Sequence, residues 1–472
     1  MLTKSDFLTY LDSPMHLWAK SHGLLADQTP SVYEQFLAEQ GQQIEYLAQL
    51  YLKQVILSEN SHLHLHWQSA YDDGRFQIRA DALIWDEKHS SFDLYEVKSA
   101  TSAHKAHIFD LAFQVLLLET LIPLRHAYLV HIDNTYQHGQ QLDLGRFFVV
   151  ENLTEQVESY RDQVEHSRQD AWKITQMPAP KPEFACTKPH ACPCPDLCHP
   201  ELPENPIYHL PFLGKKAVSL REMGIMAIED IPPDFSLSDK QRKHVEAVRT
   251  KAPLIDRQDI RSSLATLQYP LYFLDYETFN PAVPIFPGYQ PYEHIVFQYS
   301  LFVLDQPGAD PRHFEALFAD GSDPAPRITP LLVEHIREEG SVIVWNKSFE
   351  AGRNQDLARH CPQYKDQLLG INTRLYDLML IFRDGHFIDP RFQGSASLKA
   401  VLPVLCPELQ YTDLAIQSGE AAMLTWYKLH IGAIPPEEQA ETIESMKVYC
   451  KLDTFGMLAI WKHLRTICEE DE

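Results

Sequence analysis

Residues 176–206, QMPAPKPEFACTKPHACPCPDLCHPELPENP, constrain the fold more than any other part of the chain. Proline fixes φ and removes a backbone donor, so this run cannot form a regular helix or a central strand. It separates two long stretches that each alternate between strand and helix patterns, and 472 residues are too many for one hydrophobic core. The sequence therefore predicts a domain boundary here, held by something other than secondary structure.

Half of the eight cysteines lie in this segment: Cys186, Cys192, Cys194 and Cys198. The spacing C-x5-C-x-C-x3-C is close enough for one tetrahedral or cuboidal metal centre, and His190 or His199 offers a spare ligand. The remaining cysteines stand in apolar surroundings and are interpreted as core thiols: Cys361, Cys406, Cys450 and Cys468. This uneven usage is typical of a reducing cytoplasm, where disulfides are rare, so we expect a cytoplasmic protein with a bound metal.

The formal net charge of −24 argues against a protein that coats nucleic acid through bulk electrostatics. An acidic protein can still carry one basic groove, and the lysines and arginines between residues 215 and 251 are the best candidate for it. The most apolar stretch, residues 110–124, is interrupted by Gln114 and Glu119, so we expect no membrane association.

Residues 31–174 predict a helix, three strands over 63–69, 75–85 and 92–98, a helix over 104–121, two more strands and a final helix. Asp81 lies on the second strand, and Glu96 and Lys98 alternate along the third, so they project from one face. Two carboxylates on neighbouring strands can hold Mg²⁺, and a lysine can orient the attacking water. This is the chemistry of phosphodiester hydrolysis, although an isolated D…ExK pattern more often marks an exposed strand with a cross-strand lysine–acid pair.

In this α-β-β-β-α-β order the acids resemble those of the RecB-like branch of the PD-(D/E)XK nuclease superfamily, over about residues 1–200. The resemblance implies Lys98 as the catalytic lysine and Gln114 as the glutamine of the branch. It implies these metal ligands: Glu45, Asp81 and Glu96.

Members of that branch related to the CRISPR-associated type carry a 4Fe–4S cluster, held by one N-terminal cysteine and three cysteines beyond the nuclease core. The three cysteines beyond the nuclease core resemble three cysteines of this chain: Cys186, Cys192 and Cys198. Ser13 stands where the first cysteine would be, and Cys194 could replace it. The sequence leaves zinc and a 4Fe–4S cluster open as alternatives.

The C-terminal stretch carries a second group of acids. In LYFLDYE, residues 271–277, Asp275 and Glu277 are two apart at the end of an apolar strand and so share a face. Another apolar strand, 341–346, leads into a helix whose first turn bears Glu350, with Ser348 as a possible cap. In the last helix Tyr449 and Asp453 are four apart and share a helical face.

The ordered motifs D-x-E, N-x-x-x-acid and Y-x-x-x-D resemble the DEDD exonucleases of the RNase H-like superfamily, in the branch with tyrosine in its third motif. The resemblance covers about residues 268–468 and implies that Tyr449 orients the nucleophilic water. It implies four ligands for two divalent ions, Mg²⁺ or Mn²⁺: Asp275, Glu277, Glu350 and Asp453. Glu350 departs from the aspartate usual in the second motif.

The predicted fold class is α/β, with an N-terminal PD-(D/E)XK (restriction-endonuclease-like) domain over 1–200 that includes the cysteine cluster. A helical linker over 201–265, weakly similar to a helix-hairpin-helix element, leads to an RNase H-like domain over 266–472. Asp377 and Lys399 add to a resemblance with an uncharacterised bacterial family that fuses these two domains, and Lys399 is a candidate to meet a phosphate.

Two acidic constellations in fold-appropriate order predict a metal-dependent nuclease acting on DNA or RNA. Protein partners in repair or defence are a further expectation. The alternative function is a nucleic-acid-binding or partner-recruiting protein in which one or both sites are inactive. No G-x-x-x-x-G-K-[ST] motif occurs, which disfavours a self-contained ATP-driven helicase–nuclease.

Overall fold

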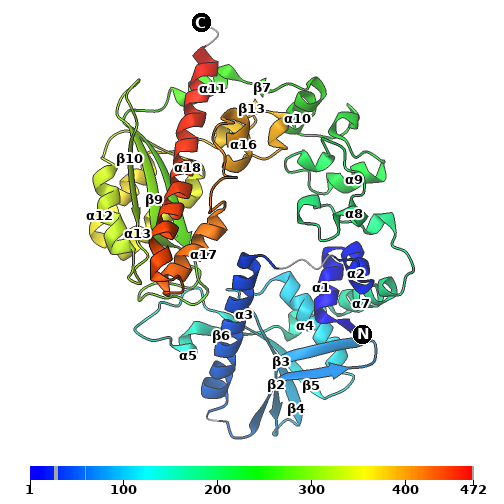
Figure 1. Cartoon of the computed structure of the whole chain (residues 1–472). Helices are drawn as coiled ribbons and strands as arrows, with labels where there is room; N and C mark the ends of the chain where they lie inside the picture. The colour runs from blue at the N-terminus through cyan, green and yellow to red at the C-terminus, as the bar shows by residue number, and fades with distance from the viewer. Residues whose placement is uncertain (26–29, 59, 470–472) are drawn as a thin grey trace. The chain divides into compact units, whose positions relative to one another are not determined.

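The computed structural model describes residues 1–25, 30–58 and 60–469, and its chain divides into two compact units (Figure 1). The first unit comprises Met1–Glu201 together with Pro281–Glu293, and the second comprises Leu202–Asn280 and His294–Glu472. The protein is of mixed α/β class, with three sheets among the described residues. Within that part of the chain, every helix is too short or too polar to cross a membrane.

The first unit follows the predicted order of elements. It opens with β1 (Leu2–Thr3), α1 (Lys4–Asp12), α2 (Pro14–Ser21) and α3 (Val32–Tyr51). The strands β2 (Leu63–Asp72), β3 (Phe76–Asp86) and β4 (Ser91–Val97) follow, then α4 (Lys105–Leu118) and β5 (Leu124–Ile132). The unit continues with α5 (Leu144–Phe147), β6 (Phe148–Asn152), α6 (Thr154–Ser159) and α7 (Arg161–Thr175). The α-β-β-β-α-β order is confirmed.

Helices cover both faces of the first sheet, whose strand order is β1-β3-β4-β5-β6 with β2 on the other side of β3. Side chains alternate across the strands, so Ala82 and Ile84 pack with α3 while Leu83 and Leu94 pack with α4. Asp81 and Glu96 are each two residues from one of those leucines and therefore lie on the α4 face. The sheet thus presents both acids to α4, on the face opposite α3.

The proline-rich segment contains no element longer than one helical turn among its described residues. It folds as two 3-10 turns, Pro182–Phe184 and Pro189–Ala191, and the four-residue helix α8 (Pro195–Cys198). This agrees with the expectation that proline would exclude regular structure here.

Residues 281–293 belong to the first unit although they interrupt the second. The chain leaves the second unit after Asn280 and returns at His294. The backbone N–H of Ala282 donates to Gln40 Oε1 at 2.7 Å, and the Tyr292 hydroxyl donates to the Ser99 carbonyl at 2.8 Å. The interruption is therefore fixed by hydrogen bonds inside the first unit.

The second unit contains α9 (Lys216–Glu222), α10 (Asp239–Thr250), β7 (Leu254–Ile255) and α11 (Arg257–Leu264) before its main sheet. Its strands are β8 (Leu271–Phe279), β9 (Ile295–Leu304), β10 (Arg312–Leu317), β11 (Ser341–Val344) and β12 (Leu375–Asp377). Between β10 and β12 lie α12 (Ala325–His335), α13 (Lys347–His360) and α14 (Lys365–Thr373). The remainder is α15 (Leu380–Arg383), β13 (Phe387–Ile388), α16 (Leu398–Leu405), α17 (Gly419–His430) and α18 (Pro436–Glu469). Ser238 is the N-cap of α10, and its side chain accepts from the Gln241 N–H.

The main sheet of the second unit has the order β10-β9-β8-β11-β12, with the first three strands antiparallel and the last two parallel to β8. Tyr272, Leu274 and Tyr276 of β8 face α12, α13 and α14. On the opposite face Phe273 meets Trp461 of α18 with ring centroids 5.8 Å apart, and α18, red in Figure 1, runs alongside β9. The strand that carries the predicted acids is therefore central and covered on both faces.

Residues 202–265 belong to the second unit and contact a later part of it at a close backbone approach. Gly394 has φ +75, and a Cβ placed there would lie 1.8 Å from the backbone oxygen of His209. Any other residue would be strained at this φ, and its Cβ would clash with the His209 backbone, so the position requires glycine. The region predicted as a linker is thereby held against the loop that precedes α16.

We predict that Gly394→Ala lowers the free energy of unfolding of the second unit by about 2–4 kcal/mol, because backbone atoms must move apart. Urea denaturation followed by circular dichroism measures this loss. Gly370→Ala is the matched control, since a Cβ at Gly370 in α14 meets nothing within 4 Å. The control variant should be unchanged or more stable by about 0.5–1 kcal/mol, and an equal loss in both variants would contradict the assignment.

Candidate functional site

The second unit brings its four predicted acidic ligands together. Asp275 and Glu277 stand on β8, Glu350 lies in the first turn of α13, and Asp453 projects from α18. One carboxylate oxygen each of Asp275 and Glu277 and the thiol of Cys450 lie within 4.8 Å of one another. Asp275 interacts electrostatically with both Asp453 and Glu350. Three separate segments of the chain thus converge on the end of the central strand.

Three of the four acidic side chains are buried, and Asp275 is partly buried. Glu350 is 2% exposed, Glu277 7% and Asp453 8%. The buried Oε2 of Glu350 has no hydrogen-bond partner among the described residues. Cys450 donates its thiol hydrogen to Asp275 Oδ2 at 3.9 Å. A buried, ionised carboxylate oxygen without a partner is costly, so the arrangement favours a proton or a cation at this position.

Burial shifts the pKa values of all four acids upward, and repulsion by neighbouring carboxylates adds to this shift for Asp275, Glu277 and Glu350. Burial, followed by the charge of Asp453, raises the pKa of Asp275 well above its usual range. Burial and then the charge of Asp275 likewise raise the pKa values of Glu277 and Glu350. Burial raises the pKa of Asp453 to about 6, although the hydroxyl of Tyr411 and the charge of Lys399 counteract it. The group can hold four negative charges only if positive charge enters.

Two tyrosines and a lysine surround the fourth acid. The Tyr411 hydroxyl donates to Asp453 Oδ1. Lys399 Nζ lies 5.4 Å from the ring centres of both Tyr411 and Tyr449, and donates to the Gln417 carbonyl at 2.8 Å. Burial, and then the charge of Asp453, raise the pKa of Tyr449, so its hydroxyl stays protonated. Tyr449 thus stands beside Asp453, as its position on the helix predicts.

The start of α13 differs in one detail from the prediction. Asn346, not Ser348, is the N-cap, and its side-chain oxygen accepts from the Phe349 N–H at 3.4 Å. Ser348 instead donates to Asn346 Oδ1 at 2.7 Å. The prediction of Ser348 as the cap was wrong because the helix begins at Lys347, two residues earlier than a Ser348 cap requires.

The first unit joins its predicted residues in a network of ion pairs. Glu96, 1% exposed, accepts from Lys98 Nζ at 2.7 Å and from Gln114 Nε2 at 2.8 Å. Lys98 Nζ also donates to Asp110 Oδ2 at 2.6 Å. Asp81 Oδ2 accepts from the backbone N–H of Val97 at 2.9 Å. Asp81, Glu96, Lys98 and Gln114 therefore belong to one site, and Asp110 joins them.

Lys4, at the start of α1, bridges the two acids on neighbouring strands. Its Nζ lies 2.8 Å from Glu96 Oε1 and 3.8 Å from Asp81 Oδ1. Burial opposes the ionisation of Glu96, but Lys98 and Lys4 together bring its pKa down to about 2. Burial and the neighbouring Glu96 charge raise the pKa of Asp81 to about 7. An ammonium group thus lies between the two carboxylates that were predicted to bind metal.

Glu45 takes part in a different contact. It lies on α3, which covers the other face of the sheet, and accepts from Gln68 Nε2 of β2. Among the described residues, no hydrogen bond or ion pair links Glu45 to Asp81 or Glu96. The structure therefore offers no support for Glu45 as a third ligand at this site.

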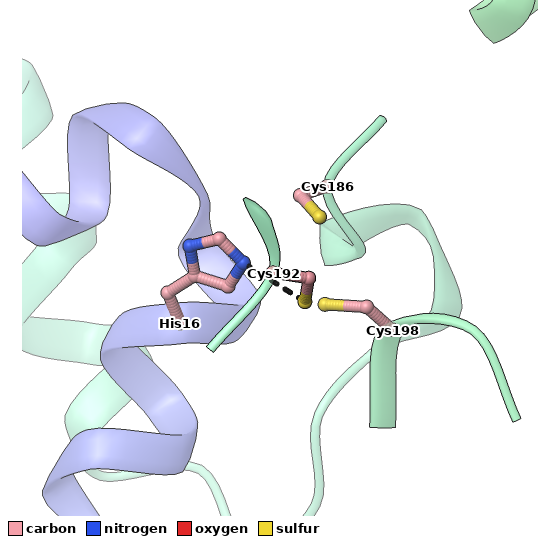
Figure 2. A group of neighbouring side chains, drawn as sticks. All are labelled: His16, Cys186, Cys192 and Cys198. Atoms are coloured by element: carbon pink, nitrogen blue, oxygen red, sulfur yellow. Dashed lines mark hydrogen bonds between the residues drawn. The ribbon is translucent and has the colours of Figure 1, made fainter. Parts of the chain in front are cut away.

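The cysteine segment forms a third group, which includes a residue from the N-terminus (Figure 2). One ligand atom each of His16, Cys186, Cys192 and Cys198 lies within 4.8 Å of the other three. Cys194 is outside this group of four, although its sulfur lies 3.8 Å from that of Cys198. His199 Nε2 lies 3.3 Å from Cys186 Sγ, and Ser13 donates its hydroxyl hydrogen to the Phe184 carbonyl at 2.7 Å. Three of the four predicted cysteines thus meet, with His16 as the fourth donor.

Several site residues were not predicted from the sequence. Asp110 precedes Gln114 by one helical turn, so the helical spacing could have revealed it. Cys450 was interpreted as a core thiol, although it lies directly beside Tyr449 in the third motif. Lys4 and Tyr411 stand in segments with no periodic or motif signal of their own.

Comparison with known proteins gives a domain of unknown function and two distant relatives. A family model described as a domain of unknown function (DUF2779) matches residues 272–397, which contain three of the four acids of the second unit but not Asp453. "Uncharacterized protein MG366 homolog" of Mycoplasma pneumoniae is 26% identical over 205 residues, covering 40% of this chain and 31% of that protein. "Uncharacterized protein UU173" of Ureaplasma parvum is 24% identical over 226 residues, covering 44% of this chain and 33% of that protein. The aligned region is about a third of each relative's length. No solved structure matches.

We predict that the metal-free protein loses stability as the pH rises. An acid whose pKa is higher in the folded than in the unfolded state binds more protons when folded, so stability falls as the pH passes through that range. For Asp453, from 3.8 to about 6, the loss is on the order of 3 kcal/mol, and the other acids add to it. Thermal unfolding in EDTA between about pH 4 and pH 8 measures the effect.

Mg²⁺ or Mn²⁺ should restore the stability at the upper end of this range and have little effect at the lower end. Glu350→Gln, which removes one charge without changing the shape, should flatten the profile. A metal-free profile that rises with pH, or an identical profile for Glu350→Gln, would show that the carboxylates do not repel one another in the folded chain.

Proposed function

We propose that this protein is a metal-dependent nuclease whose second unit hydrolyses phosphodiester bonds from a 3′ end. The observation that carries the proposal is the convergence of Asp275, Glu277, Glu350 and Asp453 in one cluster, where Lys399 and Arg353 are the positive groups acting on them among the described residues. Structural salt bridges are built with matched charges, whereas this cluster is left with excess negative charge. A site that binds divalent cations together with the substrate explains this excess negative charge.

The donor set suits a hard divalent ion. Carboxylate oxygens are the ligands preferred by Mg²⁺ and Mn²⁺, and four of them are available here. When bound, such ions supply Lewis-acid stabilisation of phosphoryl oxygens and lower the pKa of a water molecule. The mixed five-stranded sheet with acids on its central strand also supports an RNase H-like exonuclease fold for this unit.

The chain's own polar groups have separate roles in this proposal. Tyr449 is protonated at neutral pH and orients the attacking water through its hydroxyl. Tyr411 holds the carboxylate of Asp453 in one orientation by donating a hydrogen bond to it. Lys399 is held over both tyrosine rings and meets a phosphate oxygen of the substrate strand.

For the first unit we propose a RecB-like PD-(D/E)XK site at Asp81, Glu96, Lys98 and Gln114. The ion pairs among these residues and their place on the strands β3 and β4 support it. Lys4 favours a second candidate function for this unit, the binding of nucleic acid without cleavage, because its ammonium already lies between the two carboxylates and offsets part of their charge. The eight free thiols are in keeping with a cytoplasmic location, which we also propose.

We predict that purified protein cleaves end-labelled single-stranded nucleic acid with Mg²⁺ or Mn²⁺, and that Asp275→Asn lowers this activity by at least about 10³-fold, because it removes a ligand oxygen charge. Lys98→Ala should lower any cleavage activity of the first unit by about 10²–10⁴-fold. Single- and double-stranded DNA and RNA should all be tested, since the geometry does not select among them.

Asp366→Asn and Lys173→Ala are the matched controls, because both side chains are exposed and remote in sequence from the two sites. Both controls should retain full activity. Loss in only one of the two site variants assigns cleavage to one unit. If every substrate survives with every metal while still binding the protein, the binding function replaces the nuclease.

We predict that Tyr411→Phe weakens metal activation by about 10–100-fold, because Asp453 loses the hydrogen bond that orients it. The concentration of Mn²⁺ needed for half-maximal cleavage measures this effect. Tyr449→Phe should instead lower kcat at saturating metal, since its hydroxyl acts on water. Tyr364→Phe, outside the cluster, is the control, and equal metal dependence of Tyr411→Phe and the wild type would refute the positioning role.

A further inference from the structure

We infer that His16, Cys186, Cys192 and Cys198 form a mononuclear zinc site that joins α2 to the proline-rich segment. The inference concerns the first unit and does not depend on nuclease activity. It also differs from the four-cysteine centre that the sequence suggests, since His16 takes the fourth position and Cys194 does not.

The four donors face one another from four places in the chain. Figure 2 shows the His16 ring on its helix and the three cysteine sulfurs directed toward a common point. His16 Nε2 lies 3.4 Å from Cys192 Sγ, and all four donor atoms lie within 4.8 Å of one another. All eight cysteines are free thiols, so no disulfide accounts for this convergence.

His16 is held in the orientation of a metal ligand. Its Nδ1–H donates to Asp12 Oδ2 at 2.8 Å, which leaves the lone pair of Nε2 directed at the sulfurs. A carboxylate that fixes the remote ring nitrogen is the usual outer partner of metal-bound histidine. His16 is also 2% exposed, and a buried imidazole is seldom left without a polar partner on each nitrogen.

The spacing of the donors favours one ion over a cluster. Ligands that share a single tetrahedral Zn²⁺, at about 2.3 Å for each sulfur, lie roughly 3.8 Å apart. A cuboidal iron–sulfur cluster places each ligand on a different iron and holds the ligands more widely. The distances of 3.4 Å and at most 4.8 Å match the single ion. Three thiolates and one imidazole are a common structural zinc set.

The surroundings show what such a site would stabilise. Met15, Trp18 and Ala19 of α2 pack with Ile174 and the cysteines in one small apolar cluster. Trp18 Nε1–H donates to the Met177 carbonyl at 2.9 Å. The proline-rich segment contributes only single turns of its own. A zinc ion would supply the cross-link that short turns cannot.

The test is metal analysis of the full-length protein, purified without chelators and without added metal. We expect one zinc per chain and no acid-labile sulfide. The protein in which Co²⁺ replaces zinc should show the visible bands of a tetrahedral site, with a charge-transfer intensity that fits three thiolates. His16→Ala should lower zinc affinity at least tenfold, and Asp12→Ala by about tenfold.

His16→Cys provides a variant that keeps the fold if His16→Ala does not. It should retain one zinc and raise the thiolate charge-transfer intensity of the Co²⁺ form by about a third, from three sulfurs to four. Cys194→Ser and His190→Ala should keep zinc content and affinity unchanged. Iron with labile sulfide in the wild type, no metal at all, or zinc lost in Cys194→Ser but kept in His16→Ala would each overturn the inference. Nuclease assays of Asp275→Asn are unaffected by any of these outcomes.

Discussion

The repulsion among four carboxylates at the end of β8 is the interaction on which the rest of the second unit depends. At an effective dielectric constant near 20, two charges about 4 Å apart repel by roughly 4 kcal/mol. Only a rigid frame can hold Asp275 and Asp453 together against such a force. The frame is the central strand β8, on which Leu271 and Phe273 precede the acids on one face, the helix α13 with Asn346 as its N-cap, and the long helix α18 packed across the sheet. The architecture is therefore what makes an otherwise unfavourable cluster possible.

The first unit solves a similar problem in the opposite way. Its buried acids, Glu96 and Asp110, are matched by Lys98 and Lys4, and every one of these four side chains has a partner of opposite charge. A matched network gains stability from its own charges and has less need for an external cation. The two sites thus differ in electrostatic design although both rest on acids presented by strands.

Strands and helices marked by a local residue pattern could be predicted from the sequence, whereas contacts between distant segments could not. The apolar run before Asp275 and the alternation of Glu96 and Lys98 gave the strands and the faces of these acids, because strand geometry is local. Tyr411 reaches Asp453 from an irregular segment 42 positions away in sequence, and no periodicity marks such a residue. Residues 281–293 belong to the first unit although their sequence neighbours belong to the second. Chain excursions of this kind depend on tertiary packing, which a single sequence does not encode in any local pattern.

Ser13 stands where the resemblance implied a cysteine ligand, and His16, three residues later, lies in the group with the three cysteines. Ser13 is the N-cap position of α2, and its hydroxyl is used to hold the Phe184 carbonyl. A side chain one helical turn further along points to the same side of the helix, since residues i and i+3 are neighbours on its surface. Imidazole extends further from the backbone than a cysteine thiol, so His16 reaches the three sulfurs from that more distant start. In the zinc site inferred above, an imidazole three residues after Ser13 therefore takes the fourth position, so the proposed donor set is three thiolates and an imidazole instead of four thiolates.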